Sequence, residues 1–248
     1  MPQVKASGVG TAARWTGDIL ITLGVVVALL LVYQLWWTNV QAANAAESTR
    51  ADLIASWAPA VVATPQPTPT EAPEAVTAET VAPMPVTAPA VGKPFALMYI
   101  PRLRDSVWGS PVVEGVGLDE LAKGVGHYPG TAMPGEIGNF ATAAHRATHG
   151  ELFRDFDRLR KGDRVVVETR NGWYVYELDV DKIIAPTDTW VIETVPGKPD
   201  VEPTEALITL TTCNPRWAST ERWAWWGYLV EERTRDQGPP AELASKGG

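Results

Sequence analysis

The sequence has 248 residues and a mass of 26.8 kDa, enough for one sizeable domain, and 45% of its residues are hydrophobic. Its net charge of −8 and pI near 5.0 argue against nucleic-acid binding, which needs a basic face. One cysteine and three histidines exclude an intramolecular disulfide, a zinc finger, a c-type haem site and a cysteine-ligated iron–sulfur cluster.

An apolar segment near the N-terminus predicts a membrane anchor. Residues 19–37 are uncharged and, as a helix, would be about 28 Å long, which matches the hydrocarbon core of a bilayer. Lys5 and Arg14 precede this segment, and the next basic residue is Arg50. This bias places residues 1–18 in the cytoplasm and everything after the helix outside. We therefore predict a single-pass protein of the cell membrane.

A cleaved signal peptide is the alternative interpretation of this segment. The sequence AANAA at residues 42–46 offers a cleavage site after Ala45. The apolar run is at the upper end of the length of a signal peptide, and two tryptophans separate it from that site, so we favour the anchor. Both interpretations export the rest of the chain.

Residues 38–94 are predicted to be an extracellular juxtamembrane segment followed by a proline-rich linker. The alanine-rich residues 41–58 can extend the helix beyond the membrane. Nine of the 21 prolines then fall within residues 59–94, together with many Thr, Ala and Glu. Such a composition buries too little apolar surface to fold and favours an extended chain, so we interpret it as a spacer.

Residues 95–235 read as a series of short strands. The Asn171-Gly172 pair between two β-rich runs is the strongest hairpin signal. About eight strands with one or two short helices favour an all-β barrel or sandwich. Residues 236–248 are predicted to be a disordered tail. The expected strands are residues 95–100, 111–116, 140–145, the hairpin 163–184, 206–213 and 223–231, with helix at 118–125 and a turn-rich stretch at 126–139.

Cys213 is the candidate nucleophile. It is the only cysteine, it closes the strand LITLTTC, and Asn214-Pro215 ends that strand immediately afterwards. A strand end gives a rigid support next to a loop that is open to substrate. The alternative is a buried cysteine that packs as a small hydrophobic residue.

A thiol nucleophile needs a neighbouring proton acceptor or cation. His145 ends the strand NFATAAH and mirrors the position of Cys213, which makes it the best candidate. His149 lies in the following loop and His127 in the turn-rich stretch. A single histidine is more often structural than catalytic, so the choice of His145 depends on its strand-end position.

Acyl transfer also needs a group that stabilises an oxyanion. Arg222 begins the strand that returns after the cysteine loop, and a returning strand would bring it alongside Cys213. Arg216 is the rival, three residues from the thiol but inside the loop. Either arginine could equally be a surface residue.

These motifs together resemble the signature of the sortases, membrane-anchored cysteine transpeptidases of Gram-positive-type bacteria. They are TLTTC at residues 209–213, AAHR at residues 143–146 and the arginine at the next strand start. Residues 124–146, GVGHYPGTAMPGEIGNFATAAHR, resemble the class E sortases of high-GC actinobacteria. The resemblance covers roughly residues 95–230 and implies an eight-stranded sortase-type β-barrel, in agreement with the strand count.

The resemblance also implies roles for individual residues. Cys213 would be the nucleophile, His145 the general acid and base, and Arg222 the group that stabilises the oxyanion and positions substrate. Tyr128 and Thr212 would contribute to substrate binding. The chain departs from the family where Ala144 replaces a common glycine and where the last strand is rich in tryptophan.

The implied reaction is cleavage of a Leu-Pro-x-Thr-Gly or Leu-Ala-x-Thr-Gly sorting signal between Thr and Gly, through a thioacyl intermediate. The implied partners are secreted proteins that carry this signal at the C-terminus, and an amine of a peptidoglycan precursor or a pilin. The resemblance implies neither a cofactor nor a metal: we find no acidic cluster like the calcium site of class A relatives and no lid motif of pilin-polymerising relatives.

Two other functions compete with this one. A catalytically silent, membrane-anchored β-domain that binds or spaces partners would share the anchor, linker and barrel, but would not need Cys213, His145 and Arg222 together. An L,D-transpeptidase is also an exported cysteine enzyme, but that family places a histidine just before its cysteine, where this chain has Leu-Thr-Thr.

Overall fold

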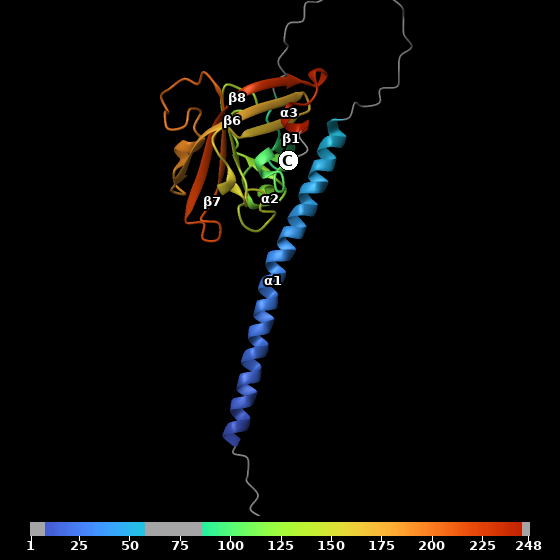
Figure 1. The fold of residues 1–248 in the computed structure, drawn as a ribbon, viewed down its shortest axis with the longest axis vertical. Helices are drawn as coiled ribbons and strands as arrows, with labels where there is room; N and C mark the ends of the chain where they lie inside the picture. Colours follow the sequence, from blue (N-terminus) through green and yellow to red (C-terminus); the bar gives the residue numbers. More distant parts are fainter. Residues whose placement is uncertain (1–7, 58–85, 245–248) are drawn as a thin grey trace, which may run out of the picture.

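A computed structural model describes residues 8–57 and 86–244 as a long helix beside a closed β-barrel (Figure 1). Most of the predicted proline-rich linker, up to residue 85, lies outside the described residues. So do residues 1–7 of the predicted cytoplasmic segment and residues 245–248 of the predicted tail.

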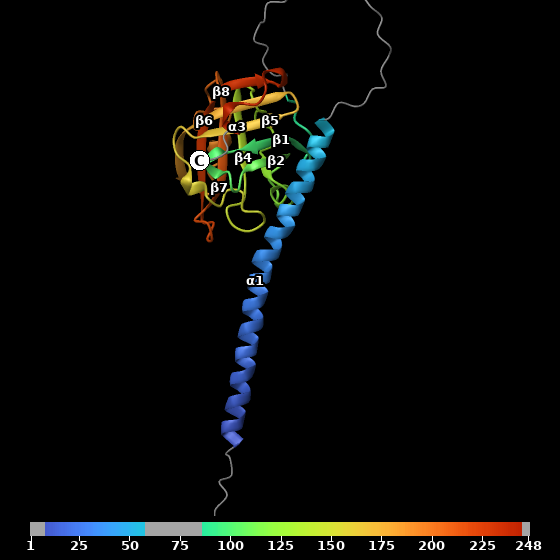
Figure 2. The ribbon, with the colours of Figure 1, turned by 45° about the vertical axis from the view of Figure 1, so that its right-hand side comes forward.

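The helix α1 (Gly8–Trp57) contains the predicted transmembrane segment and continues beyond it. Its sequence has no proline, no glycine after Gly24, and many Ala, Leu and Val, so nothing interrupts the helical hydrogen bonds. The most apolar window within residues 13–57 has a mean hydropathy of 2.4, and none of it is buried. This helix is therefore long and apolar enough to cross a membrane. Its last third lies along the barrel in both views (Figures 1 and 2).

Eight strands close the barrel in the order β1-β2-β3-β4-β7-β8-β6-β5, which confirms the predicted fold class. The β2–β3 and β4–β7 pairs are parallel and the other pairs are antiparallel. The strands are β1 (Pro94–Tyr99), β2 (Trp108–Glu114), β3 (Val125–His127), β4 (Gly138–Ala143), β5 (Arg164–Thr169), β6 (Gly172–Ile184), β7 (Ala206–Asn214) and β8 (Glu221–Thr234).

Alternation along the strands divides the apolar side chains between two sides of the barrel wall. In β1, Met98 belongs to the interior cluster, whereas Leu97 and Tyr99 belong to a cluster on the outer side. Leu53 of α1 is buried in that outer cluster together with Trp173 of β6. The helix therefore covers one outer face of the barrel, which explains why β1 is apolar at consecutive positions.

Several local features differ from the sequence-based expectation. β3 lies in the stretch that we expected to be helix and turn, because three residues are too short to show alternation and its pairing depends on β2 and β4. The predicted helix at 118–125 is limited to α2 (Leu118–Leu121). The remaining short helices are η1 (Pro101–Leu103), η2 (Phe156–Arg158), η3 (Thr189–Ile192), η4 (Arg235–Gln237) and α3 (Ala241–Ala244).

α3 and the last two residues of η4 lie within residues 236–248, the region that we expected to be a disordered tail. Leu243 of α3 packs against the outer cluster, and Arg235 lies over the rings of Trp57 and Trp173. These contacts order the chain as far as residue 244. Composition alone missed them because their partners lie on α1 and β6.

Candidate active site

The parallel pairing of β4 with β7 brings two strand ends to the same edge of the barrel. Ala143, the last residue of β4, lies opposite Thr211 of β7. The Ala144 N–H donates to the Thr211 carbonyl at 3.2 Å, and the Thr212 hydroxyl donates to the Ala144 carbonyl at 2.8 Å. His145 follows Ala144 and Cys213 follows Thr212, so both candidates emerge at this edge. His145 lies two residues beyond the end of β4 rather than within the strand, as we had expected.

β8 returns antiparallel to β7 and brings Arg222 to the same edge. Cys213 and Arg222 are paired in register, as expected for a strand that folds back after a short loop. Arg222 Nη1 donates to the carbonyls of Ser219 at 3.0 Å and Glu221 at 2.8 Å, which holds the guanidinium at the turn. Its Nε and Nη2 make no hydrogen bond with the described residues, so they can donate to a substrate oxygen.

A pocket of about 300 Å³ lies between these strand ends. All five residues singled out in the sequence line it: Cys213, His145, Arg222, Tyr128 and Thr212. The rest of the wall is mostly apolar and comes from Val116, Leu118, Leu121, Ala143, Ala144 and Thr211. Within residues 8–57 and 86–244, no three His, Cys, Asp or Glu side chains gather as a metal site.

His145 is half-buried at the pocket wall, and its environment lowers its pKa. Burial is the larger cause, because it disfavours the charged imidazolium, and the positive charge of nearby His149 adds to it. The His145 carbonyl accepts a hydrogen bond from the Phe153 N–H at 2.9 Å, which fixes the backbone. The ring itself forms no hydrogen bond with the described residues, so it can exchange a proton with a bound molecule.

Tyr128 contributes a hydroxyl to the pocket, and its hydrogen-bond direction can be deduced. The Thr211 hydroxyl donates to the Thr142 carbonyl at 2.9 Å, so its only proton is used. The Tyr128 hydroxyl, 3.1 Å from Thr211 Oγ1, must therefore donate to it. Its oxygen is left to accept from a ligand. Tyr128 and Arg222 also line an adjacent pocket of about 140 Å³, formed with the chain that follows β6.

The rival candidates lie elsewhere. His127 is fully buried inside the barrel, where its ring nitrogens contact Glu114 at 2.6 Å, Thr131 at 2.9 Å and the Ala132 carbonyl at 3.1 Å. His149 is exposed and lines a different pocket, beside α1. Neither histidine lines the pocket that contains Cys213.

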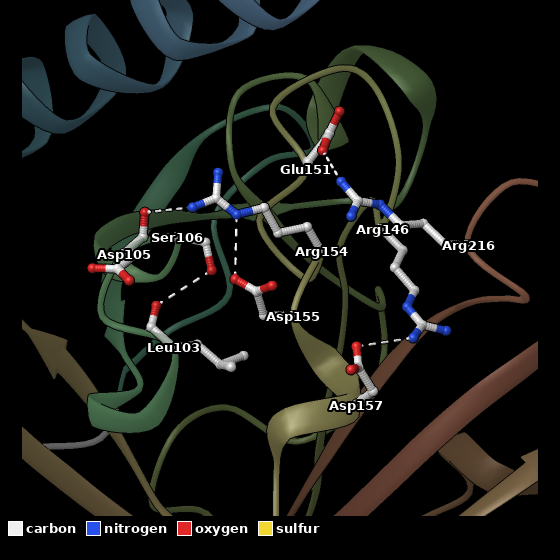
Figure 3. A network of polar contacts seen from close by, with 9 residues as sticks. All are labelled: Leu103, Asp105, Ser106, Arg146, Glu151, Arg154, Asp155, Asp157 and Arg216. Carbon is white, nitrogen blue, oxygen red and sulfur yellow. Dashed lines mark hydrogen bonds and ion pairs between the residues drawn. The ribbon is translucent and has the colours of Figure 1, made fainter.

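Arg216 also lies outside that pocket, and its guanidinium donates to Glu151 instead (Figure 3). The structure therefore brings the residues at the strand ends together and leaves the loop arginine outside. The position of a residue in a strand determines which edge of the barrel it reaches, so residues that the sequence places at strand ends can meet at one edge.

Arg146 is a supporting residue that the sequence analysis did not single out. It is 7% exposed and donates to Asn214 at 2.7 Å. It also donates to Asp157 at 3.2 Å (Figure 3). Its guanidinium also lies 5.1 Å from the centre of the Trp223 ring. These contacts tie the chain after β4 to the end of β7 and to β8. The only signal for it in the sequence is its place next to His145.

Comparison with known proteins gives a consistent result. The sortase domain family model matches residues 98–230, which is more than half of the chain. The chain is 36% identical to sortase SrtE1 of Streptomyces coelicolor over 97% of its length, and it spans 64% of the length of that relative.

Solved structures show the same similarity. Sortase E from Streptomyces avermitilis is 44% identical, with a TM-score of 0.56 over 62% of this chain and 99% of that chain. Sortase E1 from Streptomyces coelicolor, solved with a tripeptide in its active site, is 38% identical, with a TM-score of 0.56 over 63% of this chain and 99% of that chain.

Proposed function

The chain belongs to the sortase family of cysteine transpeptidases, and on this premise we propose that it cleaves a sorting signal between Thr and Gly and joins the new acyl group to an amine. The signal is of the Leu-Pro-x-Thr-Gly or Leu-Ala-x-Thr-Gly type. The observation that carries the proposal is the convergence of Cys213, His145 and Arg222 from three separate strand ends on one pocket. A silent β-domain would not need this convergence.

In the proposed reaction, Cys213 and His145 begin as thiol and neutral imidazole, in keeping with the lowered His145 pKa, and the proton passes from the thiol to the His145 ring as the sulfur attacks. The sulfur forms a bond to the Thr carbonyl carbon, the bond to the Gly nitrogen breaks, and His145 gives its proton to that nitrogen. An acceptor amine then attacks the thioacyl carbon and releases the sulfur as thiolate, while His145 takes the proton from the amine. The imidazolium then returns its proton to the Cys213 thiolate, so both groups end in their starting states.

Arg222 is proposed to stabilise the oxyanion in both steps. It is paired with Cys213 across two strands, and its hydrogen bonds to the Ser219 and Glu221 carbonyls hold it before substrate arrives. A donor that is already in position needs little reorganisation when the negative charge develops. We propose that Tyr128, through its free acceptor oxygen, and Thr212, as part of the wall, contribute to binding of the signal.

We further propose that residues 19–37 of α1 cross the cell membrane, with residues 1–18 in the cytoplasm and the barrel, residues 95–235, outside. The support is the apolar, exposed surface of this part of α1 and the Lys5 and Arg14 residues that precede it. In this location the acceptor would be an amine of a peptidoglycan precursor or a pilin, and the donors would be secreted proteins.

The first test follows the thioacyl intermediate. The full-length chain in detergent micelles, incubated with a Leu-Ala-x-Thr-Gly peptide, should give an adduct on Cys213 that ends in Thr, detected by mass spectrometry. A glycine-based amine should convert it to a new amide. Cys213→Ala should give no adduct. An adduct that forms in Cys213→Ala would refute the assignment of the nucleophile, and no turnover of any sorting peptide would favour the silent domain.

The second test separates the catalytic residues from their rivals. Arg222→Ala should slow adduct formation about 10²- to 10³-fold, the usual loss for one oxyanion donor. Arg216→Ala should cost much less, because its guanidinium contacts Glu151 outside the pocket. His145→Ala should cost about 10²-fold or more, and His149→Ala much less. Full activity in Arg222→Ala with inactive Arg216→Ala would reverse the arginine assignment.

A further inference from the structure

The loop that follows His145 has an unusual backbone. Four successive residues have positive φ: Thr148 at 58°, His149 at 49°, Gly150 at 98° and Glu151 at 48°. Three of them carry side chains that disfavour this left-handed region. Such strain persists only where the surrounding contacts over-determine the conformation.

Asn39 of α1 holds this loop from outside the barrel. Its Oδ1 accepts from the Gly150 N–H at 3.1 Å, and its Nδ2 donates to Glu151 Oε1 at 2.8 Å. Ala42, one helical turn further along, is 5% exposed and packs against Gly150. A Cβ added to Gly150 would lie 3.3 Å from the Cβ of Ala42. One face of the helix therefore fits the backbone of the strained loop.

Glu151 connects this contact to the loop that follows Cys213. Its Oε1 also accepts from the Thr148 N–H at 3.1 Å, and its Oε2 accepts from Arg216 of the β7–β8 loop (Figure 3). Burial alone would raise the pKa of the Glu151 carboxyl, but these hydrogen bonds and the Arg216 charge outweigh it and lower the pKa. The carboxylate thus stays ionised and joins three segments that are far apart in the sequence.

We propose that Asn39 and Glu151 are positioning residues for transpeptidation, and that the part of α1 next to the barrel supports the active site as well as tethering it. Through Glu151, Asn39 holds the loop that carries His145 and the loop that follows Cys213 in one arrangement. The inference rests on the proposed function, since the loops matter only if His145 and Cys213 act together. The positions of these loops should affect the rate strongly, because a small misplacement of reacting groups lowers the rate of the chemical step by a large factor.

Asn44 provides a matched control, because it is exposed on the same helix and makes no hydrogen bond with the described residues. The experiment compares Asn39→Ala with Asn44→Ala in the full-length chain in micelles, with a sorting peptide and a glycine-based amine. We expect Asn39→Ala to lower kcat about 5- to 20-fold with KM within about twofold, since the loops position chemical groups rather than the peptide. Asn44→Ala should change neither constant by more than about twofold.

Substitutions of Glu151 test whether Asn39 acts through it. Glu151→Gln keeps an oxygen that can accept from Asn39, so it should lose less kcat than Glu151→Ala. The Asn39→Ala, Glu151→Ala double variant should be no slower than Glu151→Ala alone, because both single changes break one connected network. The inference is wrong if Asn39→Ala has the same kcat as Asn44→Ala. It is also wrong if the kcat losses of Asn39→Ala and Glu151→Ala multiply in the double variant, or if Glu151→Gln loses as much kcat as Glu151→Ala.

A readout without peptide separates this inference from the proposed function. The rate of Cys213 alkylation by iodoacetamide at one pH depends on the surroundings of the thiol and needs no substrate. Asn39→Ala should change this rate at least about threefold from wild type, and Asn44→Ala should not. If no peptide is turned over, the proposed function fails, whereas equal alkylation rates in the two variants overturn the positioning role.

Discussion

The rings of His145 and His149 lie with their centres 5.6 Å apart, so a positive charge on His149 disfavours a positive charge on His145. Burial is the larger cause of the lowered His145 pKa, and the His149 charge is the second. Because the native His145 pKa is below the ordinary value of 6.5, the unfolded chain binds this proton first as the pH falls. The free energy of unfolding therefore decreases as the pH falls below about 6.5 towards the native His145 pKa.

Removal of the His149 charge should raise the His145 pKa. His149→Gln should raise it towards its ordinary value, and His149→Lys, which keeps a positive charge, should leave it low. Titration of the His145 ring by NMR, in the full-length chain labelled at histidine, measures both. Equal midpoints in wild type and His149→Gln would contradict the contribution assigned to the His149 charge.

β8 is the longest strand of the barrel, and its pairing with both β6 and β7 brings the arginine at its start to the cysteine. Gly227 of β8 lies opposite Leu178 of β6, next to a register shift in β6. A Cβ at Gly227 would collide with the backbone carbonyl of Glu177, and backbone cannot move aside as a side chain can. The glycine is therefore required by the closure of the barrel.

Gly227→Ala should lower the free energy of unfolding by about 2–3 kcal/mol, because the strands must separate or shift to admit the methyl group. The comparison is Gly162→Ala in an open turn, where no atom lies within 4 Å and only a φ of 87° opposes the substitution. That change should cost about 1 kcal/mol. Urea denaturation of the full-length chain, followed by tryptophan fluorescence, measures both. A Gly227→Ala variant as stable as wild type would show that this contact is looser than described.

On the scale of the whole molecule, α1 is one continuous helix of 50 residues, about 75 Å long. Its first part has exposed apolar side chains, and its last part lies beside the barrel (Figure 2). The contacts there involve Asn39, Ala42 and Leu53. If residues 19–37 cross the membrane, the contact at Asn39 places the barrel close to the membrane surface. The anchor then determines both the location and the orientation of the pocket.

The full-length protein should remain in the membrane fraction, since about 20 apolar residues are enough to span a bilayer. On intact cells, a membrane-impermeant thiol reagent should label Cys213, and Cys213→Ala is the control for specific labelling. Recovery of a soluble chain that begins at Ala46 would support a cleaved signal peptide and contradict the anchor. Labelling only after lysis would reverse the predicted orientation.

The sequence by itself determined the features that depend on neighbours along the chain. The long apolar run predicted a helix at residues 19–37, the Asn171-Gly172 pair predicted the β5–β6 hairpin, and the breaks after Cys213 placed the thiol at a strand end. Local composition and backbone preference are enough for these, because periodicity and turn chemistry act over a few residues.

Only the tertiary structure decided which distant residues meet. The parallel pairing of β4 with β7 joins positions about 70 residues apart and places His145, rather than buried His127, in the pocket with Cys213. Three other features likewise depend on partners elsewhere in the chain. They are the short strand β3, the packing of α3 against the outer cluster, and the contact between Asn39 and Glu151. Their stability comes from packing and hydrogen bonds that form only once the barrel closes, so no pattern along the sequence records them.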